Sequence, residues 1–219
     1  MTAATINKIS KTSKLGTLSW SLQAIETCPG SVGDDGELVA ACSGCYATTG
    51  CYSFKGTKAV RADNKAAWQE AGWVDTMVAA LKKQSFFRWF DSGDMYSLSL
   101  AVKMYEVMAA TPHVKHWLPT RMYKFAKFAA ILAKMEALPN VMVRRSSDAV
   151  DGTYTKGVHG STIIPAGMPI PAGVVACTAP EHGGKCNGCR ACYSKDVPVV
   201  AYIAHGRKMA KVIRLAVVA

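Results

Sequence analysis

The sequence contains no run of eighteen or more apolar residues, which excludes a membrane-spanning helix. Its opening segment, MTAATINKISKTSK, is polar and basic and has no apolar stretch of the kind that a secretory signal needs. We therefore expect the protein to work in a cytoplasm, without a membrane partner. A Walker phosphate-binding loop, the GxSxG element of serine hydrolases and the GxGxxG element of dinucleotide-binding folds are also absent, so these enzyme classes are not indicated.

Acidic residues are scarce relative to basic ones. The 219 residues include 15 Asp and Glu against 26 Lys and Arg, a formal net charge of +11. This excess predicts an anionic partner, with nucleic acid as one candidate, although basic residues spread along the chain also fit a solvated surface. Half of the residues are apolar, which excludes a disordered chain and indicates a substantial core.

Hydrophobic periodicity predicts that strands and helices alternate along most of the chain. We expect strands at 16–22, 85–91, 114–118 and 140–145, helices at 64–83, 97–110 and 121–137, and two short strands at 161–164 and 173–176. Such alternation is typical of α/β proteins with a parallel sheet. A long loop rich in Gly, Ser, Thr and Cys, 27–62, separates the first strand from the first helix.

Polar residues follow the later predicted strands, at positions where parallel α/β folds build their binding sites. The second strand is followed by Ser92, Gly93 and Asp94, and the fourth by Ser146, Ser147 and Asp148. We interpret both triplets as candidate cofactor-binding residues. The alternative is a purely structural role, since Ser and Asp also cap helices and build turns.

Eight cysteines fall into two groups of four. The first group is Cys28, Cys42, Cys45 and Cys51, and the second is Cys177, Cys186, Cys189 and Cys192. Four thiols complete a tetrahedral zinc site or bind a [4Fe-4S] cluster, and a reducing compartment favours such sites over disulfides. We interpret all eight as candidate metal ligands for one or two clusters.

The spacing favours iron-sulfur clusters over zinc. Both groups contain the pattern C-x-G-C-x-A, and Cys186, Cys189 and Cys192 have the C-x2-C-x2-C spacing of ferredoxin-type clusters. Zinc is the main alternative, because paired CxxC elements also build four-cysteine zinc sites. The role of Cys51 stays open: as a fourth ligand it closes the first cluster, and as a spare thiol it leaves one iron free for a small molecule.

Several blocks of the sequence resemble the bacteriophage gene product eighty-eight family. They are KTSKLGTLSWSL, CSGCYATTG, FRWFDSGDMYSL, WLPTRMYKFAKFAAIL, NVMVRRSSDAVDG and GGKCNGCRACYSKDVPVVAYIAHGRKM, and together they cover most of the chain. The resemblance implies a phage-encoded protein located in the cytoplasm of the host.

More distantly, the arrangement is similar to the radical S-adenosylmethionine (SAM) enzymes, in which three cysteines after the first strand bind a [4Fe-4S] cluster. Cys42, Cys45 and Tyr46 match the C-x-x-C-Y ending of that motif. The sequence departs from the superfamily in the 13 residues that separate Cys28 from Cys42 and in DSGD, which stands in place of GGEP.

This second resemblance implies a fold and a cofactor. The fold is a partial parallel βα barrel over residues 1–176, with a Cys-rich C-terminal extension, 177–219, packed on the barrel. The cofactor is SAM, whose methionine part would lie near 92–94 and whose ribose would lie near 146–148.

Three functions follow from these observations. The first is an iron-sulfur protein without catalysis or of unknown activity, with an electron donor as partner. The second is an enzyme that cleaves SAM to a 5'-deoxyadenosyl radical, with Arg88, Asp94, Arg121 and Arg145 as polar contacts at the barrel mouth and no catalytic residue identified. The third is a zinc-stabilised nucleic-acid-binding protein, which the net charge and the basic helix after residue 121 suggest.

Overall fold

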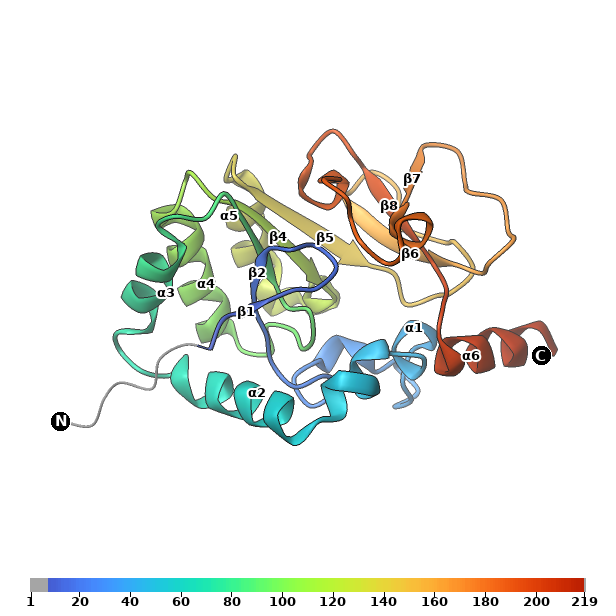
Figure 1. Cartoon of the computed structure of the whole chain (residues 1–219), viewed down its shortest axis with the longest axis horizontal. Helices are drawn as coiled ribbons and strands as arrows, with labels where there is room; N and C mark the ends of the chain where they lie inside the picture. Colours follow the sequence, from blue (N-terminus) through green and yellow to red (C-terminus); the bar gives the residue numbers. More distant parts are fainter. Residues whose placement is uncertain (1–7, 219) are drawn as a thin grey trace.

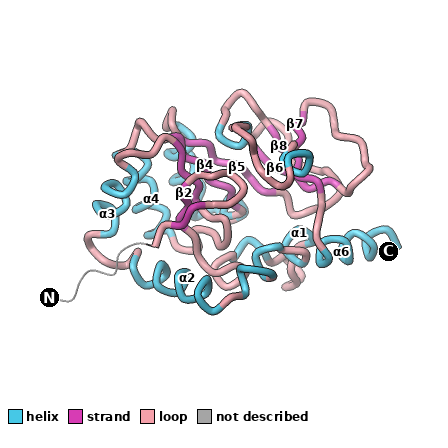
Figure 2. The backbone as a smooth tube through the Cα atoms, in the orientation of Figure 1, coloured by secondary structure: helices cyan, strands magenta, loops and turns pink. Residues whose placement is uncertain are grey.

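A single eight-stranded sheet organises the protein. The computed structural model describes residues 8–218, with side chains through residue 213. The strands lie in the order β1-β2-β3-β4-β5-β6-β8-β7 (Figures 1 and 2). Every neighbouring pair is parallel except β1 with β2. The strands are β1 Ser10–Lys11, β2 Leu18–Trp20, β3 Phe86–Trp89, β4 Lys115–Thr120, β5 Val141–Ser146, β6 Gly160–Ile164, β7 Val174–Ala176 and β8 Val199–Ile203.

Six α-helices accompany the sheet within the described residues. They are α1 Ala40–Ser43, α2 Lys55–Ala67, α3 Trp73–Leu81, α4 Leu98–Ala110, α5 Ala129–Ala137 and α6 Arg207–Val218. Figure 1 shows α3, α4 and α5 together on one side of the sheet, whereas α1 and α6 lie side by side at the other end of the molecule. The helices therefore leave one face of β3, β4 and β5 to be covered by other parts of the chain.

The largest core lies between β2–β5 and the three helices α3, α4 and α5. Residues alternate between the two faces of a strand, so Phe87 and Trp89 of β3 both enter this core and are fully buried. The rings of Trp20 and Trp73 pack edge to face at 5.3 Å between centroids. Large aromatic side chains that exclude water on this face stabilise the sheet and fix its position against the helices.

The opposite face of the sheet is covered by the second cysteine segment. Leu15, Trp117, Met142 and Tyr193 form a separate apolar cluster there, and Cys186 and Cys192 pack against it. The Phe86 and Tyr193 rings meet edge to face at 5.2 Å. The segment that follows Cys177 is therefore part of the packed protein, and β8, which follows it, lies between β6 and β7 in the same sheet.

Two helices differ from the prediction. The expected helix over 64–83 is two helices, because α2 begins at Lys55, inside the segment expected to be a loop, and ends at Ala67. The chain then turns before α3, which allows Trp68 and Trp73 both to reach the core. The expected helix over 121–137 becomes α-helical only at Ala129, because its first residues form 3-10 turns.

The prediction of an α/β protein with a mostly parallel sheet is confirmed. The sheet has two edges, β1 and β7, and the strand order does not return to its beginning. The protein is therefore a mixed α/β protein with an open, mostly parallel sheet.

Candidate metal centre

The cysteine-rich loop between β2 and α2 lies across the carboxyl ends of β4 and β5. The Ala41 amide donates a hydrogen bond to the Asp148 carbonyl at 2.9 Å, and Lys124 Nζ donates to the Gly30 carbonyl at 3.3 Å. Gly30 lies so close to Arg121 that a Cβ at residue 30 would come within 2.6 Å of the Arg121 Cβ. The loop is therefore held at the edge where parallel sheets build their sites.

This loop brings three of the four cysteines of the first group into one electrostatic environment. Burial raises the pKa of the Cys28 thiol to about 12, with Asp94, Cys42 and Cys45 adding to the rise. Burial also raises the pKa of Cys42 and of Cys45, and the Cys45 charge acts on Cys42. All three thiols are free of disulfides. Thiols with raised pKa are protonated unless a cation compensates their charge.

Basic side chains supply positive charge beside these thiols. Arg121 opposes the rise in pKa of both Cys42 and Cys45, and Lys208 of α6 acts in the same direction on Cys45. The Arg121 guanidinium is fixed by Asp148, whose Oδ1 accepts from Nε at 2.9 Å, and by the Ser147 carbonyl, which accepts from Nη2 at 2.6 Å. These cations offset part of the rise in pKa that burial causes.

Backbone groups also approach two of the sulfurs. Backbone hydrogen bonds at Ile25 and Ala47 lower the pKa of Cys28 and Cys45, respectively. Ile25 has a φ of 68°, which a β-branched residue adopts only at a strain. Hydrogen bonds to cysteine sulfur are typical of sites in which thiolates ligate iron.

Cys51 has different surroundings. It lies in a short 3-10 turn, Gly50–Ser53, and its side chain is exposed, whereas the other three cysteines of the group are buried or half-buried. The Cys51 charge acts on Tyr52, whose pKa is raised mainly by burial. The structure thus groups Cys28, Cys42 and Cys45 and places Cys51 in a more open position.

The residues after β3 are engaged in bonds within the protein. Asp94 is almost fully buried, and its carboxylate accepts hydrogen bonds from Met95 N, from Thr120 Oγ1 at 2.7 Å and from Arg121 N at 2.8 Å. Burial raises the pKa of Asp94, and these hydrogen bonds oppose the rise. The Ser92 hydroxyl donates to the Leu22 carbonyl at 2.7 Å.

Gly93 is required where it is. Its φ is 83°, and a Cβ there would lie 2.6 Å from the Leu22 Cβ and 2.7 Å from Thr27 Oγ1. The Ser92 hydroxyl and the Asp94 backbone N–H therefore fasten the loop that follows β2, at Leu22 and Thr27, and the Asp94 carboxylate joins this point to the end of β4.

The residues at the end of β5 also hold the cysteine-rich loop in place. Asp148 pairs with Arg121 and with Lys124 Nζ at 2.7 Å, and its backbone carbonyl binds the cysteine loop. The Ser146 carbonyl accepts from the Tyr123 hydroxyl at 2.8 Å, and Ser147 Oγ accepts from Ala149 N at 3.2 Å. The two predicted triplets, 92–94 and 146–148, thus lie at the same edge of the sheet as the three cysteines.

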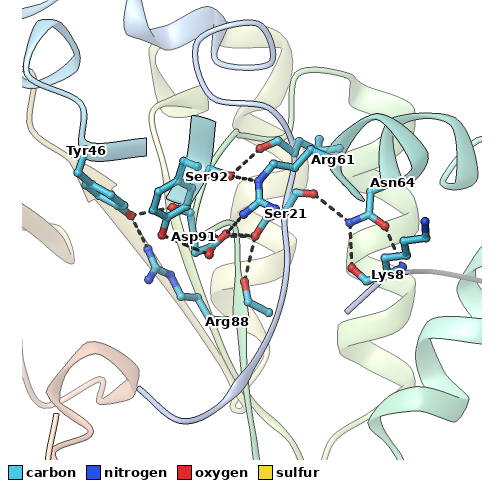
Figure 3. A network of polar contacts seen from close by, with 11 residues as sticks. Lys8, Ser21, Tyr46, Arg61, Asn64, Arg88, Asp91 and Ser92 are labelled. Carbon is cyan, nitrogen blue, oxygen red and sulfur yellow. Dashed lines mark hydrogen bonds and ion pairs between the residues drawn. The ribbon is translucent and has the colours of Figure 1, made fainter. Parts of the chain in front are cut away.

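A polar network centred on Asp91 adjoins the cysteines (Figure 3). The Asp91 carboxylate accepts hydrogen bonds from Ser21 and from Arg61 Nη2 at 3.0 Å, and its backbone carbonyl accepts from the Tyr46 hydroxyl at 2.7 Å. Arg88 Nη2 donates to the Tyr46 hydroxyl at 3.2 Å. The network links the cysteine loop to β3 and to α2, and Arg61 was not identified from the sequence.

The second cysteine group is also assembled, on the face of the sheet opposite the main core. The charges of Cys177 and Cys189 act on Cys186, and that of Cys177 acts on Cys192, while burial raises the pKa of both Cys186 and Cys192. Cys192 Sγ lies 3.2 Å from the hydroxyl of Tyr202 in β8. The second cysteine group is therefore formed by three parts of the chain: Cys177, the segment 186–192 and Tyr202 of β8.

Arg144 holds this second segment against the sheet. Its fully buried guanidinium donates hydrogen bonds only to backbone carbonyls, those of Gly160, Ala191, Cys192, Ser194, Val197 and Pro198. Burial lowers the pKa of Arg144, and the Cys192 charge opposes this effect. The sequence analysis singled out the neighbouring Arg145 and missed Arg144, although the alternation along β5 places the two on opposite faces.

Thiols within each group act on one another electrostatically but do not converge on one point. Among residues 8–218, no group of three or more His, Cys, Asp and Glu side chains is positioned to hold a single metal ion. A single zinc ion needs all of its sulfur ligands at about 2.3 Å. A four-iron cluster binds each thiolate at a different iron, so its ligands stand farther apart.

The fold and this site define a mixed α/β protein with one cysteine group at the carboxyl edge of a mostly parallel sheet and another on its face. A family model described as Gene product 88 matches residues 2–195, so the chain belongs to that family, and the predicted resemblance to it is confirmed. No curated protein and no solved structure matches the chain. None of the described helices has the length and apolarity to cross a membrane.

Proposed function

We propose that this phage-family protein is an iron-sulfur protein that binds a [4Fe-4S] cluster at Cys28, Cys42 and Cys45. The observation that supports this most directly is the grouping of these three thiols from distant loop positions beside the fixed cation of Arg121. Unligated, they are buried thiols with raised pKa values, which is an unfavourable setting for thiolate and one that bound iron reverses.

The donor set fits a cluster in three respects. The ligating atoms are sulfur, the positive charges of Arg121 and Lys208 compensate ligated thiolate, and backbone hydrogen bonds reach two of the sulfurs. The exposed Cys51 leaves the fourth position to another ligand or to solvent. We propose a second cluster at Cys177, Cys186, Cys189 and Cys192, where the buried charge of Arg144 lies beside Cys192.

The test is iron and sulfide analysis of the full-length protein purified without oxygen. We expect a brown protein with a broad visible absorption band, and an EPR signal after reduction. Cys45→Ala should lose the iron of the first site, and Cys189→Ala that of the second. Cys51→Ala is the matched control, because it removes an exposed thiol of the same loop and should keep the iron of the parent protein. A colourless protein with one zinc per site would contradict the proposal.

If the protein binds zinc at these sites, we instead favour the third hypothesis, a zinc-stabilised nucleic-acid-binding protein. Its affinity for nucleic acid should fall steeply as the salt concentration is raised. The net charge of +11 is its main support. The aromatic residues of β3 do not add to it, because Phe87 and Trp89 are fully buried in the core rather than exposed for base stacking.

Cleavage of SAM is a second proposal, and one observation supports it. Cys28, Cys42 and Cys45 follow β2 at the carboxyl edge of a mostly parallel sheet, the position of the cluster in the partial barrels of radical SAM enzymes. The predicted SAM contacts at 92–94 and 146–148 lie at this edge, with Ser92, Asp94 and Asp148 engaged in hydrogen bonds or ion pairs within the protein. SAM binding there would use backbone groups or displace these bonds.

Protein with a full complement of iron, supplied with SAM and dithionite, distinguishes the two activities. Formation of 5'-deoxyadenosine would establish SAM cleavage. An EPR signal that SAM leaves unchanged, with no product formed, would leave a non-catalytic iron-sulfur protein that takes electrons from a donor. In that case the mostly parallel sheet would be the one remaining support for a partial βα barrel.

A further inference from the structure

A cavity of about 280 Å³ lies beyond the end of β5, and it shares Ser147 and Asp148 with the residues that hold the first cysteine loop. Its walls include Tyr123, Arg145, Ser147, Asp148, Tyr154 and Thr155. The side chains of β5 alternate, so Arg145 lies on the same face as the buried Val143 and opposite the second cysteine group. The cavity thus opens on the helix side of the sheet.

The Arg145 guanidinium makes few polar contacts with the described residues. Its Nε is buried and has no hydrogen-bond partner among the described residues. Its only carboxylate partner is the half-exposed Glu136 of α5, at the long distance of 3.5 Å from Nη2. The guanidinium lies over the Tyr123 ring, 5.8 Å from the centroid, which fixes its orientation. A buried donor without an acceptor is costly, so this geometry favours an acceptor supplied from outside.

The charges around the cavity favour an anion. The one carboxylate of its wall, that of Asp148, is already paired with both Arg121 and Lys124. Two further acids lie nearby: Glu136 beside Arg145, and Asp151, whose carboxylate accepts hydrogen bonds from Thr153 of the cavity wall. They stand against the positive charges of Arg145, Arg121 and Lys124. Near Arg145, the hydroxyls of Tyr154 and Thr155 make no hydrogen bond within the part of the chain that the structure describes. These hydroxyls and the guanidinium together can satisfy more than the two oxygens of a carboxylate.

The geometry points to a binding site here for a small phosphate-bearing molecule, with Arg145 as its anchor. The Arg145 fork binds two phosphate oxygens, and the hydroxyls of Tyr154 and Thr155 donate to the others. The cavity volume suits a metabolite-sized ligand rather than a macromolecule. No cysteine is among the residues that line the cavity, so the phosphate site can be tested whether or not the cysteines bind iron.

The test is a titration of the full-length protein with inorganic phosphate, followed by amide chemical shifts in NMR spectra. We expect shifts confined to residues near 123 and 145–155. Arg145→Gln should weaken phosphate binding about tenfold or more, since one charged hydrogen-bonding group is lost. The matched control is Arg207→Gln, which removes the same charge from an exposed position of α6 and should leave binding unchanged.

Three results would overturn the assignment. They are shifts spread over the basic surface, equal losses in the Arg145 and Arg207 variants, and acetate binding as tightly as phosphate at the same amides. Thr155→Val serves as a second, milder variant at an exposed position, so that a folding defect of Arg145→Gln would not decide the outcome. In that variant we expect weakened phosphate binding and an unchanged unfolding temperature.

Discussion

Arg121 Nε lies 2.9 Å from Asp148 Oδ1, and this ion pair joins the ends of β4 and β5 beneath the cysteine loop. The same guanidinium acts on the Cys42 and Cys45 thiols. One cation therefore has two roles: it closes the edge of the sheet, and it brings positive charge to the sulfurs. The proposed cluster site and the structure of the sheet edge depend on the same residue.

Arg121→Gln separates these roles by experiment. The substitution removes the charge but keeps hydrogen-bonding capacity, and Asp148 retains Lys124. Because Asp148 is partly exposed, we expect a loss of only about 1–2 kcal/mol in the free energy of unfolding. Iron content and sulfide content should fall more clearly, because thiolate is less well compensated.

Lys127→Gln is the control, since Lys127 is exposed and lies in the next 3-10 turn. It should match the parent protein in both iron content and stability. If the Arg121 and Lys127 variants bind the same amount of iron, Arg121 has no electrostatic role at the site.

Gly30→Ala probes the close approach of the cysteine loop to β4. The new Cβ would lie 2.6 Å from the Arg121 Cβ and 2.9 Å from the Arg121 carbonyl oxygen, and backbone atoms do not move aside easily. We expect a loss of about 1–3 kcal/mol in unfolding free energy and a lower iron content, because Cys28 is two residues away.

Gly56→Ala is the matched control for this prediction. Gly56 lies in α2 with no atom within 4 Å of the added Cβ. It should increase the unfolding free energy by about 0.5–1 kcal/mol, because alanine favours helix. Urea unfolding of both variants measures the contrast, and equal effects would show that the loop does not need the close approach.

The sequence was sufficient to predict most strands and the α4 helix, because their periodicity is regular and Thr111 and Pro112 follow the last turn of α4. It also placed Cys28, Cys42 and Cys45 after the first parallel strand, β2. The break between α2 and α3 was missed because 64–83 is periodic throughout. The local signal for the turn is Gly72, which directly precedes α3, and the turn lets Trp68 and Trp73 pack into one core.

Side-chain partners were harder to predict than elements. Asp94 was interpreted as a cofactor ligand on its position after β3, but its bonds to Thr120 and Arg121 depend on the spacing of two strands that are distant in sequence. Arg144 and Arg145 are adjacent and identical in type: alternation along β5 puts them on opposite faces, but only the packing of the sheet shows which face each one takes. Sequence patterns identify the edge of the sheet, whereas the three-dimensional register determines which side chain meets which.

Arg144→Met should disrupt the second cysteine segment. The guanidinium donates to six backbone carbonyls, and methionine would remove all of these bonds. The carbonyls of Ala191 and Pro198 keep a backbone N–H as a second donor. We expect a loss of about 3–5 kcal/mol in unfolding free energy, and proteolytic cleavage between Cys177 and Pro198 should become faster. Arg144→Lys should recover only part of the loss, because an ammonium has three donors rather than five. Mass spectrometry of limited digests identifies the cleavage sites, and resistance equal to that of the parent protein would show that Arg144 is not the anchor.

His116 should make the stability of the protein depend on pH. It is fully buried between β3 and α4, where Trp89 Nε1 donates to Nδ1 at 3.2 Å and Thr111 Oγ1 lies 2.9 Å from Nε2. Burial lowers its pKa from 6.5 to about 3. The imidazole is therefore neutral in the folded protein across a range in which the unfolded chain takes up a proton.

The sign follows from proton binding. Above about pH 6.5 neither state is protonated at His116, and its contribution to stability is complete. As the pH falls from about 6.5 toward about 3, the unfolded state binds the additional proton, and the unfolding free energy decreases by at most about 1.4 kcal/mol per pH unit.

Urea unfolding of the parent protein and of His116→Gln at about pH 7 and about pH 5 measures the effect. The Gln variant should be less stable at the higher pH but lose less on acidification. His205→Gln, at an exposed position, should retain the parent pH dependence. Parallel loss of stability in the parent protein and in His116→Gln would mean that other groups cause the acid sensitivity.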